Sequence, residues 1–368
     1  MKILHICCNL AGSSVFPQLF EALHDAGIEQ EVFVPEKREE DLFKNAPEHV
    51  KTHAALTVKR TDALLFFRKA QRSVPEIMRR VDMRGVSLLH AHTLFTDGSI
   101  ARRLGRQTGT PYVVTLRYSD IEAIWRYEPH LRPMARAILR DAKRVIFLGE
   151  AARKKVLFDW LGDEDRRHVG QKSAVIPNGI APEWLTGAAR APLGGTVRVG
   201  FAGLLNRRKR PLDALAAVHL ADEAKTGRRF VLRACGKGPL EEALRAGLRE
   251  GDEYVGRVAG VEAMKRFYAG CDLLLVPSSA ETFGMVYLEA MSQGVPVLYT
   301  RGQGFDGQFP EGEAGFSVAC GDIREQARRL IDATQDYEAR SERCVSLAEG
   351  YAWPHVAAKW AALYRSVR

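Results

Sequence analysis

The chain has 368 residues, 46% of them hydrophobic and 27% charged, with a formal net charge of +9. This is a globular composition, and the length suits two domains of about 180 residues each. No apolar run approaches the roughly 18 residues of a membrane-spanning helix, and no zinc spacing, helix-turn-helix or aromatic–basic RNA motif accompanies the positive charge. We therefore expect no nucleic-acid partner, which leaves an anionic membrane surface or a phosphorylated substrate. The opening MKILHICCNL lacks a signal-peptide pattern and the six cysteines include no C-x-x-C pair, so we expect a reduced, cytoplasmic protein.

Strand and helix patterns alternate from the N-terminus, which indicates a parallel α/β sheet. The small-residue turn NLAGSS follows the first expected strand, and Gly12 in it would let a phosphate or sugar approach closely. A plain strand-to-helix turn explains Gly12 equally well. The strands expected in this half are residues 3–8, 31–35, 88–92, 112–116, 145–148 and 175–176, with helices at 15–26 and 93–109.

Residues 36–84 are polar, basic and weakly patterned, apart from the segment TDALLFFRKAQRSVPEIMRRV. Its mixture of apolar and basic side chains is typical of an amphipathic helix that lies on an anionic membrane. The alternative is a surface helix that packs on the domain core and exposes its basic face to water, and the pattern slightly favours this alternative. Peripheral contact with the inner face of the plasma membrane is therefore a secondary expectation.

The second half begins a new series of strands and helices after the segment PLGGT, residues 192–196, which is the clearest linker. We expect two Rossmann-like parallel-sheet α/β domains that face a cleft. The first comprises residues 1–180, joined by a C-terminal helix at 354–368, and the second comprises residues 181–353. The strands expected in the second are residues 197–201, 230–234, 273–276 and 297–299, with helices at 211–225, 240–249 and 285–293.

Residues 271–300 contain the most informative stretch of the chain. The apolar run LLLV predicts a strand buried on both faces, and the turn after it carries Glu281 at the edge of the sheet where ligands bind in open α/β folds. Glu289 follows about two helical turns deeper. Gly284 lets backbone N–H groups at the helix start approach an anion. The arrangement predicts a site for sugar hydroxyls and phosphate.

The loop GLLNRRKRP, residues 203–211, supplies positive charge at the same edge. Its cations and the positive end of the helix that Pro211 opens would suit a diphosphate. A second loop, RGQGFDG at residues 301–307, follows the next strand. Its glycines suit either a mobile binding loop or a structural turn.

The sequence SSAETFGMVYLEAMSQGVPV resembles the donor-site motif of family 4 glycosyltransferases, retaining enzymes of the GT-B architecture, and the resemblance extends over nearly the whole chain. It implies that Glu289 binds the ribose, Glu281 the transferred sugar and Lys209 the diphosphate. The family's arginine after Gly203 is Leu204 in this chain, so Arg207 or Arg208 takes its role. The other residues expected on the donor are Gly203, Gly236, Thr282, Phe283, Gly284 and Met285, together with Gly12, where the family often has two glycines and this chain has one.

The N-terminal half departs from the family at Arg117, which stands where the family has a histidine near the reacting carbon of the donor sugar. Arg117 would bind a phosphate of donor or acceptor, and with Glu281, Lys209 and Arg208 it completes the expected catalytic set. Asp120, Tyr118 and His92 are expected on the acceptor side. We expect His90 and His92 to point to opposite faces of their strand, where one lines the cleft or both are hydrogen-bonded core histidines.

No catalytic metal and no cofactor are expected. An Asp-x-Asp motif could bind a divalent metal ion, but the one at residues 163–165 lies in a charged turn that we interpret as a solvated loop. The resemblance implies transfer of a sugar, with retention, from a nucleoside-diphosphate sugar of the UDP or GDP type. The segment MSQGVPVLYTRGQGFDGQF is similar to bacterial enzymes that build surface polysaccharides, which implies a glycan or lipid-linked acceptor. The alternatives are a nucleotide-sugar epimerase and a non-catalytic nucleotide-sugar binding protein of the same fold.

Overall fold

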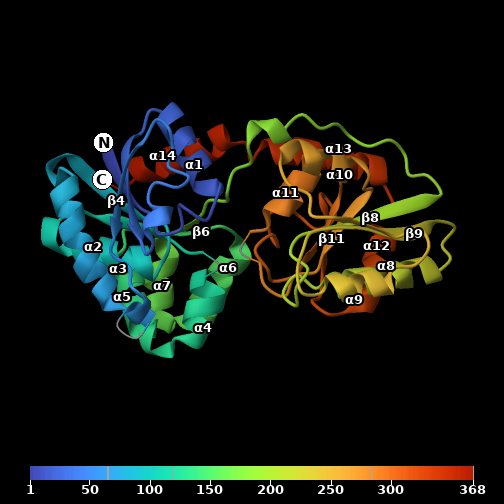
Figure 1. Ribbon diagram of the computed structural model, residues 1–368, viewed down its shortest axis with the longest axis horizontal. Helices are drawn as coiled ribbons and strands as arrows, with labels where there is room; N and C mark the ends of the chain where they lie inside the picture. Colours follow the sequence, from blue (N-terminus) through green and yellow to red (C-terminus); the bar gives the residue numbers. More distant parts are fainter. Residues whose placement is uncertain (64–65, 118, 282, 368) are drawn as a thin grey trace. The chain divides into compact units, whose positions relative to one another are not determined.

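The computed structural model describes residues 1–63, 66–117, 119–281 and 283–367. The chain divides into two compact units (Figure 1). The first comprises Met1–Leu148, Ala152–Gly179 and Trp353–Arg368, and the second comprises Gly149–Ala151 and Ile180–Ala352. Each unit contains one parallel sheet, so the predicted α/β class is confirmed.

The sheet of the first unit has seven strands in the order β3-β2-β1-β4-β5-β6-β7, and every pairing is parallel. This is the doubly wound order, in which crossovers leave from a central first strand to both sides. Its elements are β1 (Lys2–Ile6), α1 (Val15–Asp25), β2 (Glu29–Glu36), β3 (Lys51–Leu56), α2 (Phe67–Arg80), β4 (Val86–Ala91), α3 (Thr96–Thr108), β5 (Tyr112–Thr115), α4 (Trp125–Tyr127), α5 (Arg132–Asp141), β6 (Arg144–Phe147), α6 (Glu150–Lys155), α7 (Asp163–Gln171), β7 (Ser173–Val175) and α14 (Trp353–Arg365).

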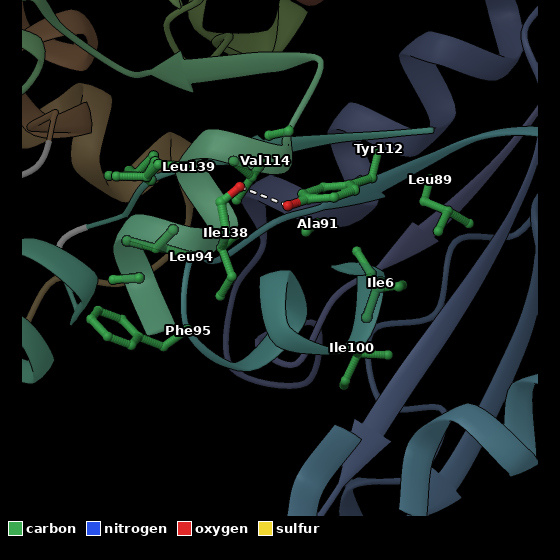
Figure 2. Close-up of a cluster of buried hydrophobic side chains, with 14 of the residues drawn as sticks. Ile6, Leu89, Ala91, Leu94, Phe95, Ile100, Tyr112, Val114, Ile138 and Leu139 are labelled. Carbon is green, nitrogen blue, oxygen red and sulfur yellow. Dashed lines mark hydrogen bonds between the residues drawn. The ribbon is translucent and has the colours of Figure 1, made fainter. Parts of the chain in front are cut away.

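Helices cover both faces of this sheet. On one face α1 packs beside the C-terminal α14, whose Val356, Trp360 and Tyr364 are buried in the same apolar cluster as Phe20 (Figure 1). On the other face α2, α3 and α5 share a second cluster with the strands. Figure 2 shows this second cluster, in which the Tyr112 hydroxyl donates to the carbonyl of Ile138 at 2.6 Å. Since strand residues alternate between the two clusters, each central strand is apolar on both sides.

The second unit repeats the arrangement with six parallel strands in the order β10-β9-β8-β11-β12-β13. Its elements are β8 (Thr196–Ala202), α8 (Pro211–Glu223), β9 (Arg229–Cys235), α9 (Glu241–Gly247), β10 (Glu253–Gly256), α10 (Val261–Ala269), β11 (Leu273–Val276), α11 (Met285–Met291), β12 (Val297–Thr300), β13 (Gly315–Val318), α12 (Ile323–Asp332) and α13 (Tyr337–Glu349). The predicted buried strand at 273–276 is fully buried, as its unbroken apolar run requires.

Two expectations about local structure were wrong. The chain passes from the first unit to the second at Gly179–Ile180, whereas the glycine-rich segment 192–196 lies inside the second unit and leads into β8. Residues 163–165 form the first turn of α7, where three carboxylates suit the positive end of a helix, and Asp165 accepts hydrogen bonds from Arg140. Within the described residues, no helix is long and apolar enough to cross a membrane.

Candidate functional site

The candidate donor site is a set of loops at the carboxyl edge of the second sheet. Because all its strands are parallel, the loops after β8, β9, β11 and β12 leave from the same edge. These loops comprise residues 203–210, 236–240, 277–284 and 301–307. They contain the predicted donor residues apart from Gly12 in the first unit and Met285 and Glu289 on α11.

Lys209 and Glu281 meet between the first and third of these loops. The Lys209 ammonium donates to Oε2 of Glu281, and their side chains are only 12% and 13% exposed. The Lys209 backbone N–H donates to the side-chain oxygen of Asn206 at 3.0 Å, which fixes the turn that presents the lysine. The pair places a cation and a carboxylate within contact of each other at the edge of the sheet.

Arg208 ties the same two loops together. Its carbonyl accepts from the Ser279 N–H at 2.8 Å, and its guanidinium donates to the carbonyl of Ala280 at 3.3 Å. Arg207 is exposed, and the described residues give it no hydrogen bond or ion pair. Of the two predicted alternatives, Arg208 is thus occupied by the neighbouring loop and Arg207 presents its cation to solvent.

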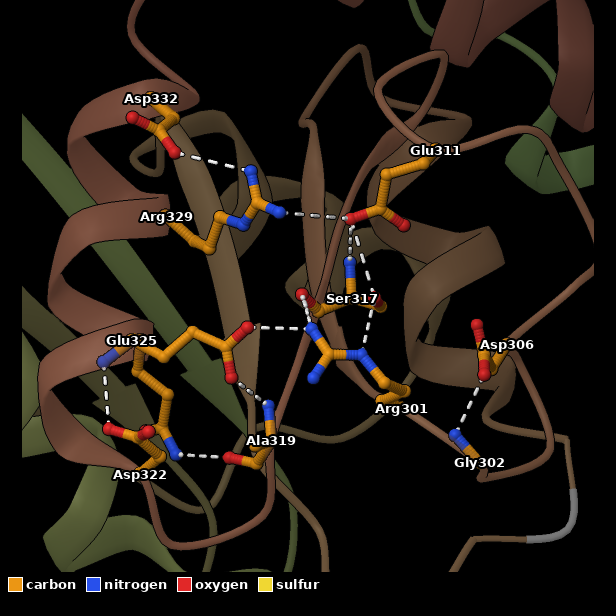
Figure 3. A network of polar contacts seen from close by, with 11 residues as sticks. Arg301, Gly302, Asp306, Glu311, Ser317, Ala319, Asp322, Glu325, Arg329 and Asp332 are labelled. Atoms are coloured by element: carbon orange, nitrogen blue, oxygen red, sulfur yellow. Dashed lines mark hydrogen bonds and ion pairs between the residues drawn. The ribbon is translucent and has the colours of Figure 1, made fainter.

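The loop 301–307 holds the backbone of Glu281 in place by two hydrogen bonds, a role that the sequence did not reveal. The Glu281 N–H donates to the side-chain oxygen of Gln303 at 2.9 Å, and the Glu281 carbonyl accepts from the Gly304 N–H at 2.9 Å. Figure 3 shows how the loop is anchored: Arg301 donates to Glu325 at 2.6 Å, and the Gly302 N–H donates to Asp306 at 2.7 Å. These contacts are those of a structural turn, the second of the two interpretations.

Glu289 lies on α11, partly buried, and Tyr268 of α10 donates to it at 3.2 Å. Burial raises the pKa of Glu289 to about 7, against the opposing influence of the Tyr268 hydrogen bond and the Lys209 charge. Tyr268 is itself fully buried. It is a second functional candidate that sequence reasoning missed, because a tyrosine on the buried face of an amphipathic helix is indistinguishable from a core residue.

Glycines let the loops after β8 and β9 pack backbone against backbone. Gly236 has φ +141°, and a Cβ there would lie 1.8 Å from the carbonyl oxygen of Gly203. The loops are also joined by a hydrogen bond from the Leu205 N–H to the carbonyl of Lys237 at 3.0 Å. Gly203 and Gly236 therefore shape the loop that presents Lys209.

The start of α11 follows Gly284, which is left-handed with φ 87° and sits against the ring of Tyr287. Phe283 is buried, and the centroid of its ring lies 6.2 Å from that of Phe305. Its side chain therefore packs inside the loop and does not face solvent. Met285, the first residue of α11, is partly exposed. Thr282 lies outside the described residues.

In the first unit, Arg117 follows β5 and its guanidinium is engaged by neighbouring residues. It donates to Asn178 at 3.1 Å and lies 4.6 Å from the ring of Phe16. Burial lowers its pKa to about 10. Asp120 is fully buried and accepts from the backbone N–H groups of Arg117 and Phe95 at 2.8 and 3.3 Å, and burial raises its pKa to about 6. Its carboxylate fixes the loop, so the geometry does not present it to an acceptor hydroxyl.

Tyr118 lies outside the described residues. Gly12 is partly exposed, and a Cβ at this position would meet nothing within 4 Å, so no close approach inside the chain requires the glycine. Asp97 at the start of α3 was missed: it is buried, accepts from the Cys8 N–H at 3.0 Å and thereby fixes the loop after β1. Burial raises the pKa of Asp97 to about 7.

His90 and His92 point to the same face of their strand, so the expectation of opposite faces was wrong: side chains two residues apart on a strand share a face. Their rings lie 3.9 Å apart and His5 of β1 joins them. All three are fully buried, and burial lowers their pKa values, that of His5 to about 3. Both ring nitrogens of His90 are hydrogen-bonded, to Tyr364 at 2.7 Å and to Thr115 at 2.8 Å. The His5 and His92 rings are stacked, with Nδ1 of His5 3.0 Å from Nε2 of His92, whereas the His90 and His92 rings are tilted. Nε2 of His5 and Nδ1 of His92 are buried and have no hydrogen-bond partner among the described residues. One nitrogen of each histidine lies within 4.8 Å of the other two, so the spacing of this buried cluster also suits a metal ion.

Comparison with known proteins matches both halves of the chain to family models. Residues 12–179 match a glycosyl transferase 4-like domain, and residues 192–348 match glycosyl transferases group 1. The D-inositol 3-phosphate glycosyltransferase of Corynebacterium kroppenstedtii is 26% identical over 298 residues, which is 73% of this chain and 64% of the relative. A second such enzyme, from Corynebacterium urealyticum, is covered over 52% of its length, so the chain spans about half to two thirds of these curated relatives.

Solved structures share the fold over the whole chain. A sucrose-phosphate synthase from Thermosynechococcus elongatus superimposes with a TM-score of 0.74 at 20% identity, covering 100% of this chain and 99% of that one. The Anabaena protein HepE in complex with UDP gives 0.72 at 18% identity, with 100% of both chains covered. At these identities the likeness establishes the architecture, two parallel-sheet domains.

Proposed function

Because the chain belongs to the glycosyl transferases of group 1, with a glycosyl transferase 4-like N-terminal half, we propose that it transfers a sugar from a nucleoside-diphosphate sugar to a hydroxyl of a glycan or lipid-linked acceptor. The observation that carries this proposal is the contact of Lys209 with Glu281 at the carboxyl edge of the second sheet, with Glu289 on the helix that follows. This edge is where open α/β sheets bind ligands.

The proposed chemistry rests on fixed positive charge. When the bond from the anomeric carbon to the diphosphate breaks, negative charge grows on the phosphate oxygens, and preorganised cations stabilise it most effectively. Lys209 and the exposed Arg207 supply this charge from one loop. Glu281, fixed through its backbone by Gln303 and Gly304, accepts from hydroxyls of the transferred sugar, and Glu289 accepts from the ribose.

We propose retention of configuration, which the family resemblance supports. The acceptor oxygen bonds to the anomeric carbon on the face that the diphosphate leaves, and the acceptor proton passes to the departing phosphate oxygen. The proposed reaction needs no protein carboxylate as a base. The ion pair of Glu281 with Lys209 agrees with this, because it leaves Glu281 less available to accept a proton. Residues 1–180 bind the acceptor in this proposal, and Arg117, which stands at the position of the family histidine, binds a phosphate of donor or acceptor.

The donor is proposed to carry UDP or GDP. The structure of Anabaena HepE with UDP supports the first of these by analogy of fold. We further propose a role in polysaccharide synthesis and a cytoplasmic location, peripheral at the inner face of the plasma membrane.

A donor-turnover assay tests the function. Purified protein is incubated with each candidate nucleotide sugar, and release of free nucleoside diphosphate and the identity of the sugar are followed by chromatography. Release that disappears in Lys209→Ala and Glu281→Ala supports transfer. Conversion of the intact donor into another nucleotide sugar would identify an epimerase, whereas binding without either reaction would identify a non-catalytic nucleotide-sugar binding protein.

A further inference from the structure

The three buried histidines of the first unit lie on the two central strands of its sheet. His5 of β1 is paired with His90 of β4 in the sheet register, and His92 follows His90 on the same face. All three are 0% exposed, so bulk water does not reach their nitrogens. Aromatic rings of α1 and α14 enclose the cluster, with centroids 4.7–5.3 Å from those of the histidines: Phe16, Phe20 and Trp360.

The ring nitrogens of the cluster are unequally satisfied. His90 uses both of its nitrogens, which bond to the hydroxyls of Tyr364 and Thr115. His5 and His92 share one contact, so the second nitrogen of each has no hydrogen-bond partner in the described part of the chain. Folded proteins rarely leave buried polar atoms unsatisfied. Two such atoms in one cluster indicate a further group that the hydrogen bonds of the protein do not supply.

The spacing of the nitrogens suits a single ion. Nitrogens that share a tetrahedral zinc lie about 3.3 Å apart, because each Zn–N bond is about 2.0 Å long. The 3.0 Å between Nδ1 of His5 and Nε2 of His92 is close to this separation, and one nitrogen of each of the three rings lies within 4.8 Å of the other two. A small rotation of His90 toward them would complete a set of three ligands. One of its two hydroxyl partners would then be released, and the other would fix the orientation of the ring, as partners of metal-bound histidines do.

We propose that His5, His90 and His92 together bind one transition-metal ion, and that this ion is zinc. Imidazole ligands suit zinc, copper, nickel and iron, and of these zinc imposes no geometry of its own on a set of ligands. The ion is structural, because fully buried ligands leave no position open to a substrate.

The proposed ion would join β1 to β4 at the ends from which the loops of the first unit leave. Its closest link to those loops is the carbonyl of His92, which accepts from the Arg117 guanidinium at 3.4 Å. The alternative is a core cluster that holds no ion. The proposal goes beyond the transfer reaction, concerns no catalytic metal and does not depend on the donor site.

The metal content of the full-length protein without an affinity tag tests the site. Cells are grown with added zinc, which supplies the ion during folding, when the buried ligands are accessible. After gel filtration in a chelator, zinc and the other first-row metals are measured by mass spectrometry. We expect one zinc ion per chain in the wild type, and at least about tenfold less in His5→Phe and in His92→Phe, each of which removes one ligand.

The matched control is His24→Gln combined with His49→Gln. These two exposed histidines of the same unit have stacked rings 5.5 Å apart, and His49 contacts Glu21 at 2.9 Å, so they are the surface pair on which zinc could bind adventitiously. The control protein should retain its zinc. Loss of the zinc in this protein would assign the ion to the surface and overturn the proposal.

X-ray absorption at the zinc edge tests the ligands in the wild-type protein, so a variant that does not fold leaves the test intact. The spectrum should show a first shell of nitrogen and oxygen only, with the outer scattering of three imidazole rings. Sulfur in the first shell would assign the ion to cysteines and overturn the proposal. Wild-type protein that holds no first-row metal ion would overturn it as well. Nucleotide binding is measured separately, so failure of either proposal leaves the other standing.

Discussion

Glu281 is fixed by its backbone on both sides, with its N–H bonded to Gln303 and its carbonyl to Gly304. A carboxylate that must contact sugar hydroxyls in the transition state depends on such support, because a displacement of about 1 Å can reduce the rate a hundredfold. If Glu281 binds the transferred sugar as proposed, Gln303 is a positioning residue that acts through Glu281.

Replacement of Gln303 by methionine keeps the shape of the side chain and removes the acceptor. We expect kcat to fall between about tenfold and a hundredfold while KM for the donor changes little, because Glu289 and Lys209 still bind it. Gln303→Glu retains an accepting oxygen and should restore most of the rate. Steady-state kinetics of the three proteins checks this, and a Gln303→Met variant with unchanged kcat would contradict the role.

Glu289 predicts a pH dependence of donor binding. Burial raises its pKa from 4.5 to about 7, so the folded unit retains a proton where the unfolded chain has lost it, and the stability from this proton disappears as the pH rises through 7. The ribose hydroxyls need the ionised form as their acceptor. Donor affinity should therefore rise about tenfold between about pH 6 and pH 8.

Calorimetric titration with an intact nucleotide sugar, whose diphosphate does not titrate in this range, measures the effect. Glu289→Gln should bind weakly at every pH. Tyr268→Phe removes a hydrogen bond that stabilises the ionised form and should move the midpoint upward. A wild-type affinity that is flat across neutral pH would contradict the assignment of Glu289 to the ribose.

Among the elements, the close contact between the loops after β8 and β9 depends on glycine. In Gly236→Ala the new Cβ would lie 1.8 Å from the Gly203 carbonyl oxygen, so the backbone must move. We expect the second unit to lose roughly 2–4 kcal/mol of unfolding free energy, from overpacking and backbone strain together. Gly194→Ala is the control, since a Cβ there meets nothing within 4 Å. Equal melting temperatures in thermal unfolding would refute this explanation.

The central strands could be predicted from the sequence, because an unbroken apolar run such as that of β11 indicates a parallel strand buried on both faces. The end of each run also locates the loop that follows the strand. It missed β3, whose sequence KTHAAL buries only Ala54 and Ala55 and pairs with one neighbour at the edge of the sheet. Edge strands lack the two-sided apolar signal on which the prediction depended.

The donor loops could be located from the sequence, but the connections between them could not. Gln303 and Tyr268 reach Glu281 and Glu289 from positions 22 and 21 residues away, and such contacts depend on the packed fold. The same holds for Asp120, which reads as an exposed loop carboxylate until the backbone N–H groups around it are known. Local pattern identifies the edge of the sheet, and tertiary packing decides which side chains remain available there.

At the scale of the whole molecule, the last helix belongs to the first unit although it follows the second in the sequence. Trp360 is 2% exposed and shares a cluster with residues of α1, so Trp360→Ala should cost the first unit about 3–5 kcal/mol. Donor affinity should remain unchanged, because the residues assigned to the donor in the second unit are untouched. Unfolding and donor titration of the same variant check both statements, and a parallel loss of donor affinity would show that the units do not act separately in binding.

The central claim is that the loops around Lys209, Glu281 and Glu289 bind a nucleoside diphosphate sugar. A thermal-unfolding screen of the wild-type protein against UDP, GDP and ADP sugars tests it most directly. One donor should raise the unfolding temperature of the second unit, by an amount that corresponds to about 2.7 kcal/mol at a hundredfold excess over Kd, and Lys209→Met and Glu289→Gln should reduce or abolish the shift. The absence of a shift with every donor in the wild-type protein would contradict the account.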